Sequence, residues 1–553
     1  MNVSSFDIFD TCLVRLCGTP THFFDVLSYQ AFVESVPECL RQRFVAERRE
    51  AEHQAAVLLG AKCTLADIYG HFAFSYPLLL PKERLMKIEM NCEKSMLRPV
   101  LSMRRKVEDC RERGHHIIFI SDMYLPGWFL KSVLIQFGFF KDEDTLYVSC
   151  EVGKSKYKGE LFNYVLVKEN LSKRKWTHYG DNRYGDIQGA RFAGLKVQRI
   201  EHAYSPIQNL WSLKDYVNGF KYPGVMAGIS RALCCSNEDN SHKHMVVDLI
   251  APLVCSFTYG VMKAASAKHF SRLFFCARDT YSMYQVAQKM KPMFPDLEID
   301  YLYISREALY EGEDEGRLAY YRQIGLASRN EDVAIVDFVT GGKTMMVLNR
   351  LLQNNGYRKV YGYFLYKWEH FDIEVDFDCC HFELSQAYLK GVAFEPFIFL
   401  IRTQFFENFF GMNDQKRTVG YVMSGDKYEP VFTESPIQQD GNIPNRKQWL
   451  IVHQSLIDQF ADAFLTTGLY RYSEDVFKNL VMNALVFFSS TPDRIYLEPM
   501  LEYRITEDGI PMVKKKSLIG LVLTRGRDSE WRRGTIYYNL PKWLVSFIVR
   551  FLQ

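Results

Sequence analysis

Carboxylate, hydroxyl and amine side chains follow short apolar segments at several points in the N-terminal third of the chain. They are Asp7, Asp10, Ser121, Lys156, Asp181 and Asp186. A carboxylate that attacks a phosphoryl group must approach a second negative charge, so the attack needs a cation, a lysine and a hydroxyl donor to neutralise and orient the partners. Asp7, at the tip of an expected strand, is placed to be the nucleophile. Asp181 and Asp186 can complete with Asp7 an oxygen site for Mg²⁺, the cofactor that we expect.

Two further residues complete this constellation, and two roles stay open. Lys156 balances charge, and Ser121 donates a hydrogen bond to the transferring group. Lys154, two positions before Lys156, is a rival for the lysine role. Asp10 is either a catalytic acid and base or a residue that starts a helix or turn. The neighbouring polar residues are expected to serve turns, caps and loops: Asp122, Asn182 and Arg183.

Short apolar strands alternate with helical stretches over the same region. We expect strands at Val3–Phe6, His116–Ile120, Thr145–Val148, Thr177–Tyr179 and Lys196–Ile200. Helical stretches such as Val100–Arg113 and Lys158–Val167 separate them, and this alternation predicts a parallel sheet covered by helices, an α/β fold. Because the carboxyl ends of parallel strands meet at one edge, we expect the polar groups that follow these strands to lie close together.

A long helical insertion, from about Thr19 to Arg98, follows the first strand. Its longest run, Glu38–Leu58, has a charged face that we expect to be solvated. The residues of this face are Arg41, Arg43, Glu47, Arg48, Glu50 and Glu52. We expect the insertion to form a helical lobe over the carboxyl edge of the sheet.

Four segments resemble the ordered motifs of the haloacid-dehalogenase-like (HAD) superfamily. They are FDIFDT (6–11), ISDM (120–123), EVGKSK (151–156) and GDNRYGD (180–186). The resemblance covers roughly residues 1–205 and implies a Rossmann-like domain with a helical cap of the first type at about 19–98. It further implies a hydrolase, and for Asp7 an aspartyl-phosphate intermediate.

Phe9 is a departure from the phosphatase pattern of that superfamily, in which a second aspartate two positions after the nucleophile acts as general acid and base. The aromatic residue resembles the dehalogenase branch, whereas Asp181 and Asp186 favour a metal site that dehalogenases do not use. The departure leaves three readings open: a slow phosphatase, an acid supplied by Asp10 or by the cap, or a phosphoryl-binding domain without turnover.

A second constellation lies in the other half of the chain, where an expected strand, Val333–Val336, is followed by Asp337 and a glycine-rich segment that opens a helix. Backbone N–H groups at such a helix start suit an anion. Two other loops are expected at the same sheet edge. Together the candidate anion-binding residues are Arg278, Asp279, Arg306, Asp337, Thr340, Gly341, Gly342, Lys343 and Thr344. The alternative to an anion site is that Gly341 and Gly342 only cap the helix.

This second segment resembles the ribose-phosphate loop of type I phosphoribosyltransferases. That family has two adjacent acids before the loop, whereas Phe338 stands in the second position here. The combination of both parts also resembles two-part proteins of bacterial surface-polysaccharide gene clusters. The resemblance implies an anionic ligand, such as a nucleotide sugar or a ribose phosphate, and a carbohydrate-related context.

Composition bounds the remaining possibilities. With 553 residues, 48% of them hydrophobic and 24% charged, the chain is expected to form several globular domains. A net charge of +3 gives no indication of nucleic-acid binding, and 13 cysteines without metal-type pairs indicate reduced, cytoplasmic thiols. Basic and aromatic residues near the C-terminus, from Lys514 to Trp543, raise a peripheral membrane contact as an alternative to a helix docked on the core.

The sequence thus predicts a Mg²⁺-dependent HAD-like phosphohydrolase that acts on a small phosphorylated metabolite. We expect this domain at 1–205, a linker at 206–243, a second α/β domain at 244–395 and a mixed, aromatic-rich region at 396–553. The alternatives are an impaired HAD-like binding or regulatory protein, a glycosyl- or phosphoribosyl-type transferase that uses the second domain, and, more distantly, a dehalogenase.

Overall fold

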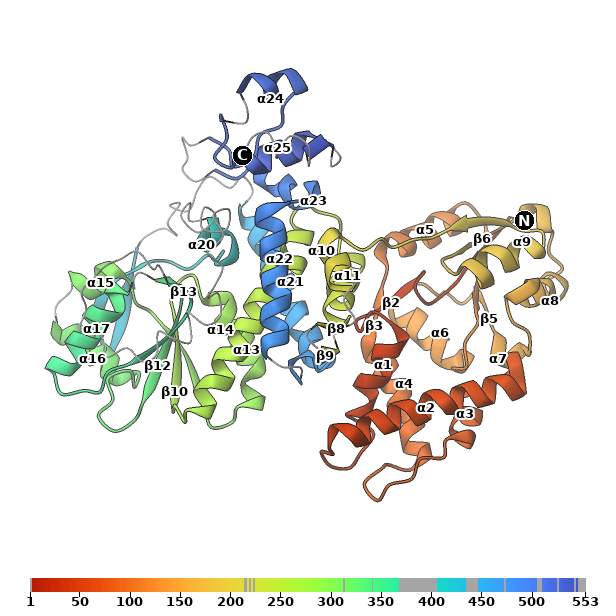
Figure 1. Ribbon diagram of the computed structural model, residues 1–553, viewed down its shortest axis with the longest axis horizontal. Helices are drawn as coiled ribbons and strands as arrows, with labels where there is room; N and C mark the ends of the chain where they lie inside the picture. The colour runs from red at the N-terminus through yellow and green to blue at the C-terminus, as the bar shows by residue number, and fades with distance from the viewer. Residues whose placement is uncertain are drawn as a thin grey trace. The chain divides into compact units, whose positions relative to one another are not determined.

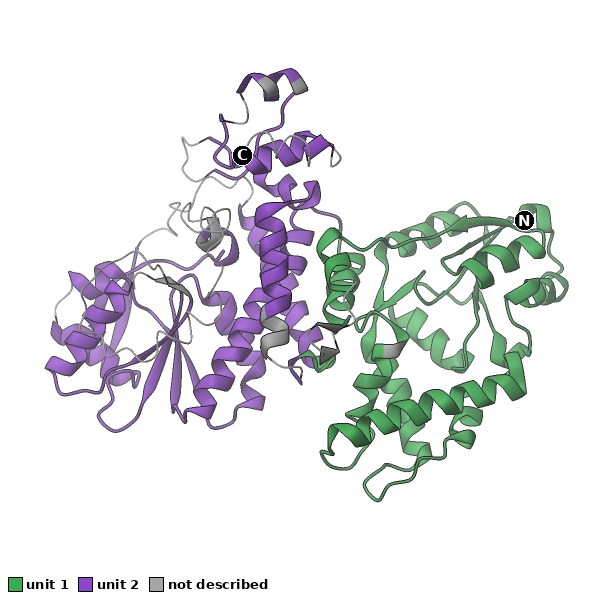
Figure 2. Ribbon diagram, in the orientation of Figure 1, with its two compact units in different colours: residues 1–238, 466–469 green, residues 239–465, 470–553 purple. Residues whose placement is uncertain are grey.

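The chain folds into two compact units, coloured separately in Figure 2: residues 1–238 with 466–469, and residues 239–465 with 470–553. The computed structural model describes residues 2–212, 216–217, 220–221, 224–311, 314–340, 342–367, 405–433, 446–471, 474–504, 510–524, 527–541 and 544–545. Each unit carries its own parallel sheet and its own hydrophobic core.

The first unit contains a five-stranded sheet in the order β5-β4-β1-β6-β7, and every pair in it is parallel. Its strands are β1 (Val3–Phe6), β4 (His116–Ser121), β5 (Thr145–Val148), β6 (Trp176–Gly180) and β7 (Lys196–Arg199). The helices between them are α5 (Leu101–Glu112), α6 (Gly127–Gln136), α7 (Ser149–Val152), α8 (Glu160–Lys168) and α9 (Ala190–Phe192). The expected Rossmann-like α/β sheet is therefore confirmed.

Four helices form the lobe inserted after β1, which Figure 1 shows in red to orange. They are α1 (Pro20–Ser28), α2 (Glu38–Leu59), α3 (Leu65–His71) and α4 (Lys82–Met96). An antiparallel pair, β2 (Leu13–Arg15) with β3 (Leu97–Pro99), closes the base of the insertion. The helical cap expected at about 19–98 is thus present.

Hydrogen bonds to Tyr124 hold the lobe against the loop that follows β4, and a buried ion pair braces the lobe itself. Leu65 N donates to Tyr124 O at 3.0 Å, and Tyr124 Oη donates to Glu89 Oε1 at 3.1 Å. Arg48 binds both oxygens of Glu89, and both side chains are fully buried. The expectation that Arg48 belongs to a solvated face is wrong, because a long helix with charges all round can direct one of them inward where a buried carboxylate pairs with it.

The predicted linker, 206–243, contains two helices instead, α10 (Pro206–Ser212) and α11 (Val225–Ser236), and a short pair β8 (Tyr216–Val217) with β9 (Phe220–Lys221). Most residues of α11 are buried. Its small residues hide its periodicity in the sequence, because glycine, alanine and cysteine mark an apolar face weakly. Residues 206–238 of this segment belong to the first unit, and residues 239–243 begin the second.

The second unit contains a four-stranded parallel sheet in the order β11-β10-β12-β13. Its strands are β10 (Arg272–Cys276), β11 (Glu298–Leu302), β12 (Val333–Thr340) and β13 (Tyr361–Lys367). The second α/β fold is confirmed, but β12 runs four residues beyond the expected strand. Asp337 therefore lies in a strand and not in a turn, because the apolar residues Phe338 and Val339 that follow it continue the strand.

The helices of this sheet follow its strands along the chain: α14 (Tyr281–Met290), α15 (Arg306–Tyr310), α16 (Asp314–Gln323) and α17 (Lys343–Asn354). Before them a continuous apolar helix spans Lys243–Ala267, made of α12 (Lys243–Met245), a π-helical turn and α13 (Ala251–Ala267). By length and composition this helix is able to cross a membrane, but 94% of its apolar window is buried inside the structure, as in the core helix of a globular unit.

Much of the C-terminal region packs onto the second unit. The hairpin β14 (Thr418–Ser424) with β15 (Lys427–Phe432) stacks Tyr421 on Tyr320 with ring centroids 4.4 Å apart. The described helices of this region are α20 (Phe405–Phe410), α21 (Arg446–Thr466), α22 (Glu474–Ser490), α23 (Arg494–Leu497), α24 (Leu518–Thr524) and α25 (Arg532–Asn539). Trp531 and Tyr538 of the aromatic tail are buried, whereas Trp543 lies outside the described residues.

Candidate functional site

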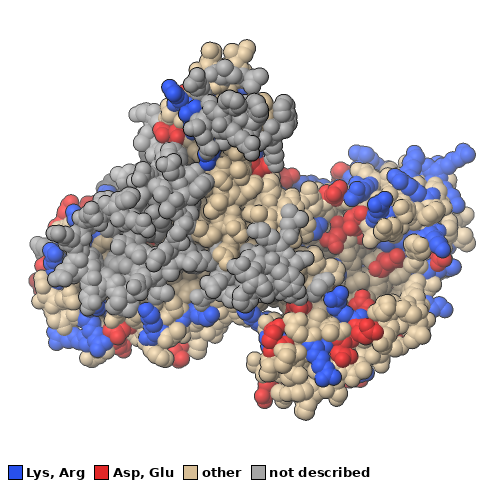
Figure 3. Space-filling view, in the orientation of Figure 1, with Lys and Arg blue, Asp and Glu red and all other residues tan. Residues whose placement is uncertain are grey.

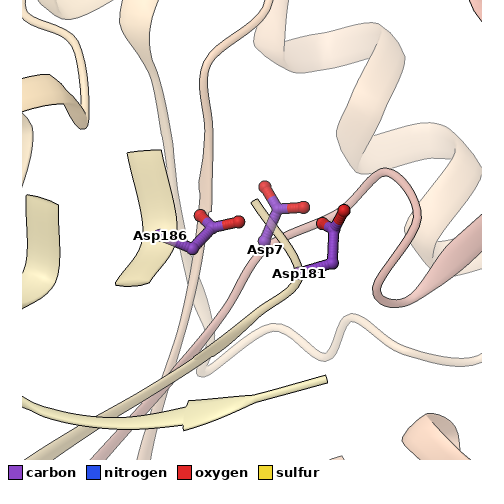
Figure 4. Close-up of side chains that lie close together, drawn as sticks. All are labelled: Asp7, Asp181 and Asp186. Carbon is purple, nitrogen blue, oxygen red and sulfur yellow. The ribbon is translucent and has the colours of Figure 1, made fainter. Parts of the chain in front are cut away.

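Three carboxylates converge at the carboxyl edge of the first sheet. The ligand oxygens of Asp7, Asp181 and Asp186 lie within 4.8 Å of one another, and Figure 4 shows the three groups side by side. Asp7 follows β1 and Asp181 follows β6, and these strands are parallel neighbours with Phe6 opposite Tyr179. Both residues therefore leave the sheet at the same edge. Asp186 lies in a π-helical turn, Arg183–Gly189, and not in the short loop that was expected.

Lys156 is the cation of this cluster. Its Nζ lies 2.5 Å from Asp7 Oδ1 and 2.5 Å from Asp186 Oδ1, and only 4% of the residue is exposed. Lys154 is exposed, because the chain turns between the two lysines. The geometry therefore selects Lys156 of the two candidates.

Two neighbouring side chains fix the backbone around Lys156 and Asp186. Both oxygens of Asp122 accept a hydrogen bond from Lys156 N at 2.9 Å, which ties the loop after β4 to the lysine. Asn182 caps the π-helical turn by accepting from Tyr184 N and Gly185 N, and its own N–H donates to Asp186 Oδ2 at 2.9 Å. Asp122 and Asn182 thus serve the turns, as expected, but each of them also positions a residue of the cluster.

A buried hydrogen-bonded chain supports Asp186 from behind. Trp176 Nε1 donates to Ser5 Oγ at 2.7 Å, Ser5 Oγ lies 2.8 Å from His178 Nδ1, and His178 Nε2 lies 3.2 Å from Asp186 Oδ1. The ionised Asp186 can only accept, so His178 Nε2 carries the proton that it donates to Asp186. The Nδ1 of the neutral ring then accepts from the Ser5 hydroxyl, whose oxygen accepts from the indole. Burial lowers the pKa of His178, which agrees with this neutral form.

Charge is unevenly balanced in the cluster, with three carboxylates around one ammonium. Burial, and then the charge of Asp186, raises the pKa of Asp7 well above its usual value. Burial and the same neighbour raise the pKa of Asp181 to about 6. Burial would also raise the pKa of Asp186, but Lys156 and His178 outweigh it and lower that pKa. Hard oxygen ligands with excess negative charge are what a divalent cation requires, so the residues fit a metal site.

Ser121 ends β4, the parallel neighbour of β1, and is buried. Thr11 Oγ1 donates to Asp181 Oδ1 at 3.2 Å, so the turn after β1 reaches the cluster through a residue that the sequence did not single out. Asp10 does not join the three carboxylates. It has a positive φ of 55° and pairs with Arg231 Nη2 at 3.4 Å.

Phe9 occupies the position two residues after Asp7, and the guanidinium of Arg15 lies 4.4 Å from its ring centroid. Arg15 Nε in turn donates to Glu93 Oε1 of the lobe at 2.6 Å. A phenyl ring offers no proton, so this position supplies neither a general acid nor a general base.

On the face drawn in Figure 3, acidic side chains gather on the first unit between its sheet and its helical lobe.

The second unit brings only some of its predicted residues together. Asp337, in β12, is close enough to Asp279 and Arg306 to feel their charges, and burial with the Asp279 charge raises the pKa of Asp337 to about 7. Lys343 and Thr344 start α17 after Gly342, whose φ is +88°. Arg278 follows β10, Thr340 ends β12, and Gly341 lies outside the described residues.

A pocket of about 400 Å³ lies beside the start of α17. It is lined by Leu309, Tyr310, Asp314, Arg317, Lys343, Val347 and Leu351. Lys343 Nζ lies 5.7 Å from the Tyr310 ring centroid, and Arg317 is buried with no hydrogen-bond partner on Nε among the described residues. Tyr310 and Arg317 were missed from the sequence, where nothing ties them to the glycine-rich segment.

His178 and Arg231 were also missed in the first unit. His178 precedes Asp181 by three residues, but a histidine inside a strand is more often a packed core residue. Arg231 lies in the segment that was taken for a linker, and its contact with Asp10 spans more than two hundred residues. Neither residue belongs to a recognisable motif.

No protein-family model matches the chain, and no curated protein matches it. Solved structures resemble part of it. A HAD phosphatase from Thermococcus onnurineus is 18% identical, with a TM-score of 0.28, over 40% of this chain and 100% of the other. A HAD-family enzyme from Bacteroides thetaiotaomicron is 13% identical, with a TM-score of 0.29, over 39% and 99%. L-2-haloacid dehalogenase from Xanthobacter autotrophicus is 11% identical, with a TM-score of 0.29, over 43% and 90%.

Proposed function

We propose that the first unit is a Mg²⁺-dependent phosphohydrolase that acts on a small phosphorylated metabolite, such as a sugar phosphate or a nucleotide. The observation that carries this proposal is the meeting of Asp7, Asp181 and Asp186 with the buried Lys156 at one sheet edge. A lone acid after a strand has many structural uses. Three acids around one lysine at a strand edge are a costly arrangement unless a cation and an anion bind there.

The three carboxylates would hold the metal, and a bound Mg²⁺ would supply positive charge for the phosphoryl oxygens and the attacking carboxylate. Lys156 holds Asp7 and Asp186 in position and carries charge toward the phosphoryl group. Ser121, at the end of β4, donates a hydrogen bond to that group. His178 keeps Asp186 oriented through its Nε2–H.

Two displacements make up the proposed reaction. In the first, an Asp7 carboxylate oxygen forms a bond to phosphorus while the bond from phosphorus to the leaving oxygen breaks. The leaving oxygen takes its proton from water, since Phe9 has none to give. In the second, a water oxygen attacks phosphorus, the Asp7–phosphorus bond breaks, and the water's proton leaves with phosphate or solvent. Asp7 is regenerated as a carboxylate.

The test is release of inorganic phosphate from a panel of sugar phosphates and nucleotides, with and without Mg²⁺, by wild type and Asp7→Asn. We expect Asp7→Asn to lose at least about a thousandfold in rate, because no other described group can replace the attacking oxygen. Release at equal rates by both proteins would remove the proposal. Halide release without metal, from a haloacid panel, would favour the dehalogenase alternative instead.

A binding or regulatory role is the second candidate, and Phe9 is the observation that favours it. A site that keeps its metal ligands and lysine but lacks a proton donor can hold a phosphorylated ligand and turn it over slowly or not at all. Tight phosphate binding without release from any substrate would support this reading.

For the second unit we propose an anionic ligand, such as a nucleotide sugar or a ribose phosphate. Lys343 and the N–H groups at the start of α17 would take the phosphate, and the pocket beside Tyr310 would take an apolar or ring-bearing part. A transferase activity at this edge would need Asp337. It predicts diphosphate or nucleotide release that depends on Asp337 and survives Asp7→Asn.

We also propose a cytoplasmic location and a carbohydrate-related context. The reduced cysteines favour the first, since none of the described cysteines forms a disulfide. The second follows only from the resemblance of the two-part organisation. Peripheral membrane contact by the C-terminal tail is tested by liposome co-sedimentation of the full chain against a chain shortened at residue 540.

A further inference from the structure

Helix α11 carries an arginine into the turn that holds the nucleophile. Arg231 Nη2 lies 3.4 Å from Asp10 Oδ1, and Nη1 donates to Tyr204 Oη at 3.3 Å. The guanidinium also lies 4.8 Å from the Tyr204 ring centroid, and its side chain is 12% exposed. Its Nε has no hydrogen-bond partner among the described residues. Arg231 is thus a largely buried cation whose one carboxylate partner among the described residues is Asp10.

The position of α11 is set by direct backbone packing. Gly228 lies so close to the β2 end that an added Cβ would collide with Gly18 N and Leu16 O. A Cβ on Gly224 would collide with the ring of His22. From the segment just before α10, His202 Nε2 lies 3.0 Å from Thr11 O. Helix α11 and the segment before it therefore both contact the turn that runs from Asp7 to Thr11, through Arg231 and His202.

Asp10 lies in the turn that meets the carboxylate cluster. It follows Asp7 by three residues and precedes Thr11, whose hydroxyl donates to Asp181 Oδ1 at 3.2 Å. Without a neighbouring cation, Asp10 would add a fourth negative charge beside the place where a phosphate has to bind. Arg231 is the only described cation with an ion pair to Asp10.

We propose that Arg231 cancels the charge of Asp10 beside the carboxylate cluster, and that α11 thereby sets how tightly the first unit binds a phosphate dianion. Arg231 is a positioning residue in this role. The inference rests on the proposed function in taking the cluster as the site of metal and phosphate.

The proposal predicts effects of opposite sign on the two ligands. Arg231→Gln leaves Asp10 unbalanced, so it weakens phosphate binding but leaves Mg²⁺ binding equal or tighter. Asp10→Asn leaves Arg231 unbalanced, so it tightens phosphate binding and weakens Mg²⁺ binding. We expect each single change to shift phosphate affinity about three- to tenfold, as for one charge at partly screened range. The double variant returns both affinities to within about twofold of wild type.

The experiment is calorimetric titration of the full-length protein, first with Mg²⁺ alone and then with inorganic phosphate at saturating Mg²⁺. Arg231→Lys keeps the charge and is expected to retain phosphate affinity, which covers the case that Arg231→Gln folds poorly. Arg105→Gln is the matched control, because Arg105 forms an exposed ion pair with Glu238 of the same unit. Its affinities are expected to equal those of wild type.

The outcomes separate this inference from the proposed function. If both single variants weaken both ligands and the double variant is worse, the pair is only structural and the inference is overturned. Release of phosphate from the panel of sugar phosphates and nucleotides, and from p-nitrophenyl phosphate, is measured in parallel. The opposite-sign pattern without any turnover supports the inference and removes the phosphohydrolase. Turnover without the opposite-sign pattern supports the phosphohydrolase and overturns the inference. Absence of phosphate binding by wild type contradicts both proposals.

Discussion

Both units place acids at the carboxyl edge of a parallel sheet, but they balance the charge in different ways. In the first unit Lys156 lies between Asp7 and Asp186, and the carboxylates converge with a third, Asp181. In the second unit Asp337 faces the charge of Asp279, and the basic residues are spread over the loops and over the start of α17.

The difference shows what a buried acid requires at such an edge. Asp186, which pairs with Lys156 and also accepts from His178, has its pKa lowered and stays ionised, whereas burial and the charge of Asp186 raise the pKa of Asp7 although it shares the same lysine. Where no described lysine is paired with it, Asp337 has its pKa raised to about 7 and is part protonated at neutral pH. The carboxyl edge of the first sheet is therefore suited to binding a cation together with a phosphate. The edge of the second sheet is suited to a ligand that Asp337 binds by a hydrogen bond and that contacts the N-terminus of α17.

Replacing Lys156 tests the first half of this comparison with the largest expected effect. Lys156→Met leaves the buried carboxylates of Asp7 and Asp186 without their cation, and we expect the free energy of unfolding to fall by about 3–5 kcal/mol. Urea unfolding measures it. Lys154→Met, two residues away and exposed, is the control, with an expected change within about 0.5 kcal/mol. Equal losses in both variants would contradict the role given to Lys156. Added Mg²⁺ is expected to stabilise Lys156→Met more than wild type.

The absence of a proton donor at Phe9 is tested by varying the leaving group. We expect p-nitrophenyl phosphate, whose leaving oxygen needs no proton, to be cleaved at least about a hundredfold faster than an alkyl phosphate, because a general acid contributes about that much. Phe9→Asp should narrow the gap without closing it, since Arg15 lies over this position and would pair with the new carboxylate. Equal rates for aryl and alkyl phosphates in wild type would point to an acid elsewhere.

The second edge is tested by the pH dependence of stability. The pKa of Asp337 is raised to about 7 in the folded protein, so ionisation costs the folded state. The free energy of unfolding should therefore fall as pH rises from about 4 to about 7 and stay level above that. Asp337→Asn should reduce this fall without abolishing it, because the pKa values of Asp7 and Asp181 are also raised, and it should be more stable than wild type by about 1–3 kcal/mol at alkaline pH. Unfolding curves that stay parallel across the range would contradict the assignment.

Lys343 gives the smallest expected effect. Lys343→Gln removes the cation at the start of α17 and is expected to weaken binding of pyrophosphate to the full-length protein about tenfold. Lys268→Gln, an exposed lysine of the same unit, is the control. If both variants bind pyrophosphate as wild type does, the second edge is no anion site and the glycines only cap the helix.

Much of the fold could be predicted because strand and helix patterns are local. β1 and β5 begin and end at the residues expected, since each is a short segment bounded by polar residues. The α10–α11 segment could not, because its small residues show no clear face. Nor could the inward turn of Arg48, whose partner Glu89 lies 41 residues away.

The candidate site divides in the same way. Asp7, Asp181 and Lys156 follow strands whose order in the sheet can be anticipated, so their meeting could be predicted. Asp10 was left open, and only the structure shows it turned to Arg231. His178 and Arg231 act through contacts with no sequence signature, because any strand can carry a histidine and any helix an arginine.

The hydrogen bonds that run from Trp176 through Ser5 and His178 to Asp186 make the first three residues depend on one another, so a change of one affects the others. Because Asp186 can only accept, His178 donates from Nε2 and accepts at Nδ1 from the Ser5 hydroxyl, whose oxygen in turn accepts from the Trp176 indole. A relative without the Ser5 hydroxyl would leave the buried indole N–H and His178 Nδ1 without these partners. We therefore expect Trp176, Ser5 and His178 to be exchanged together or not at all among proteins that keep this site.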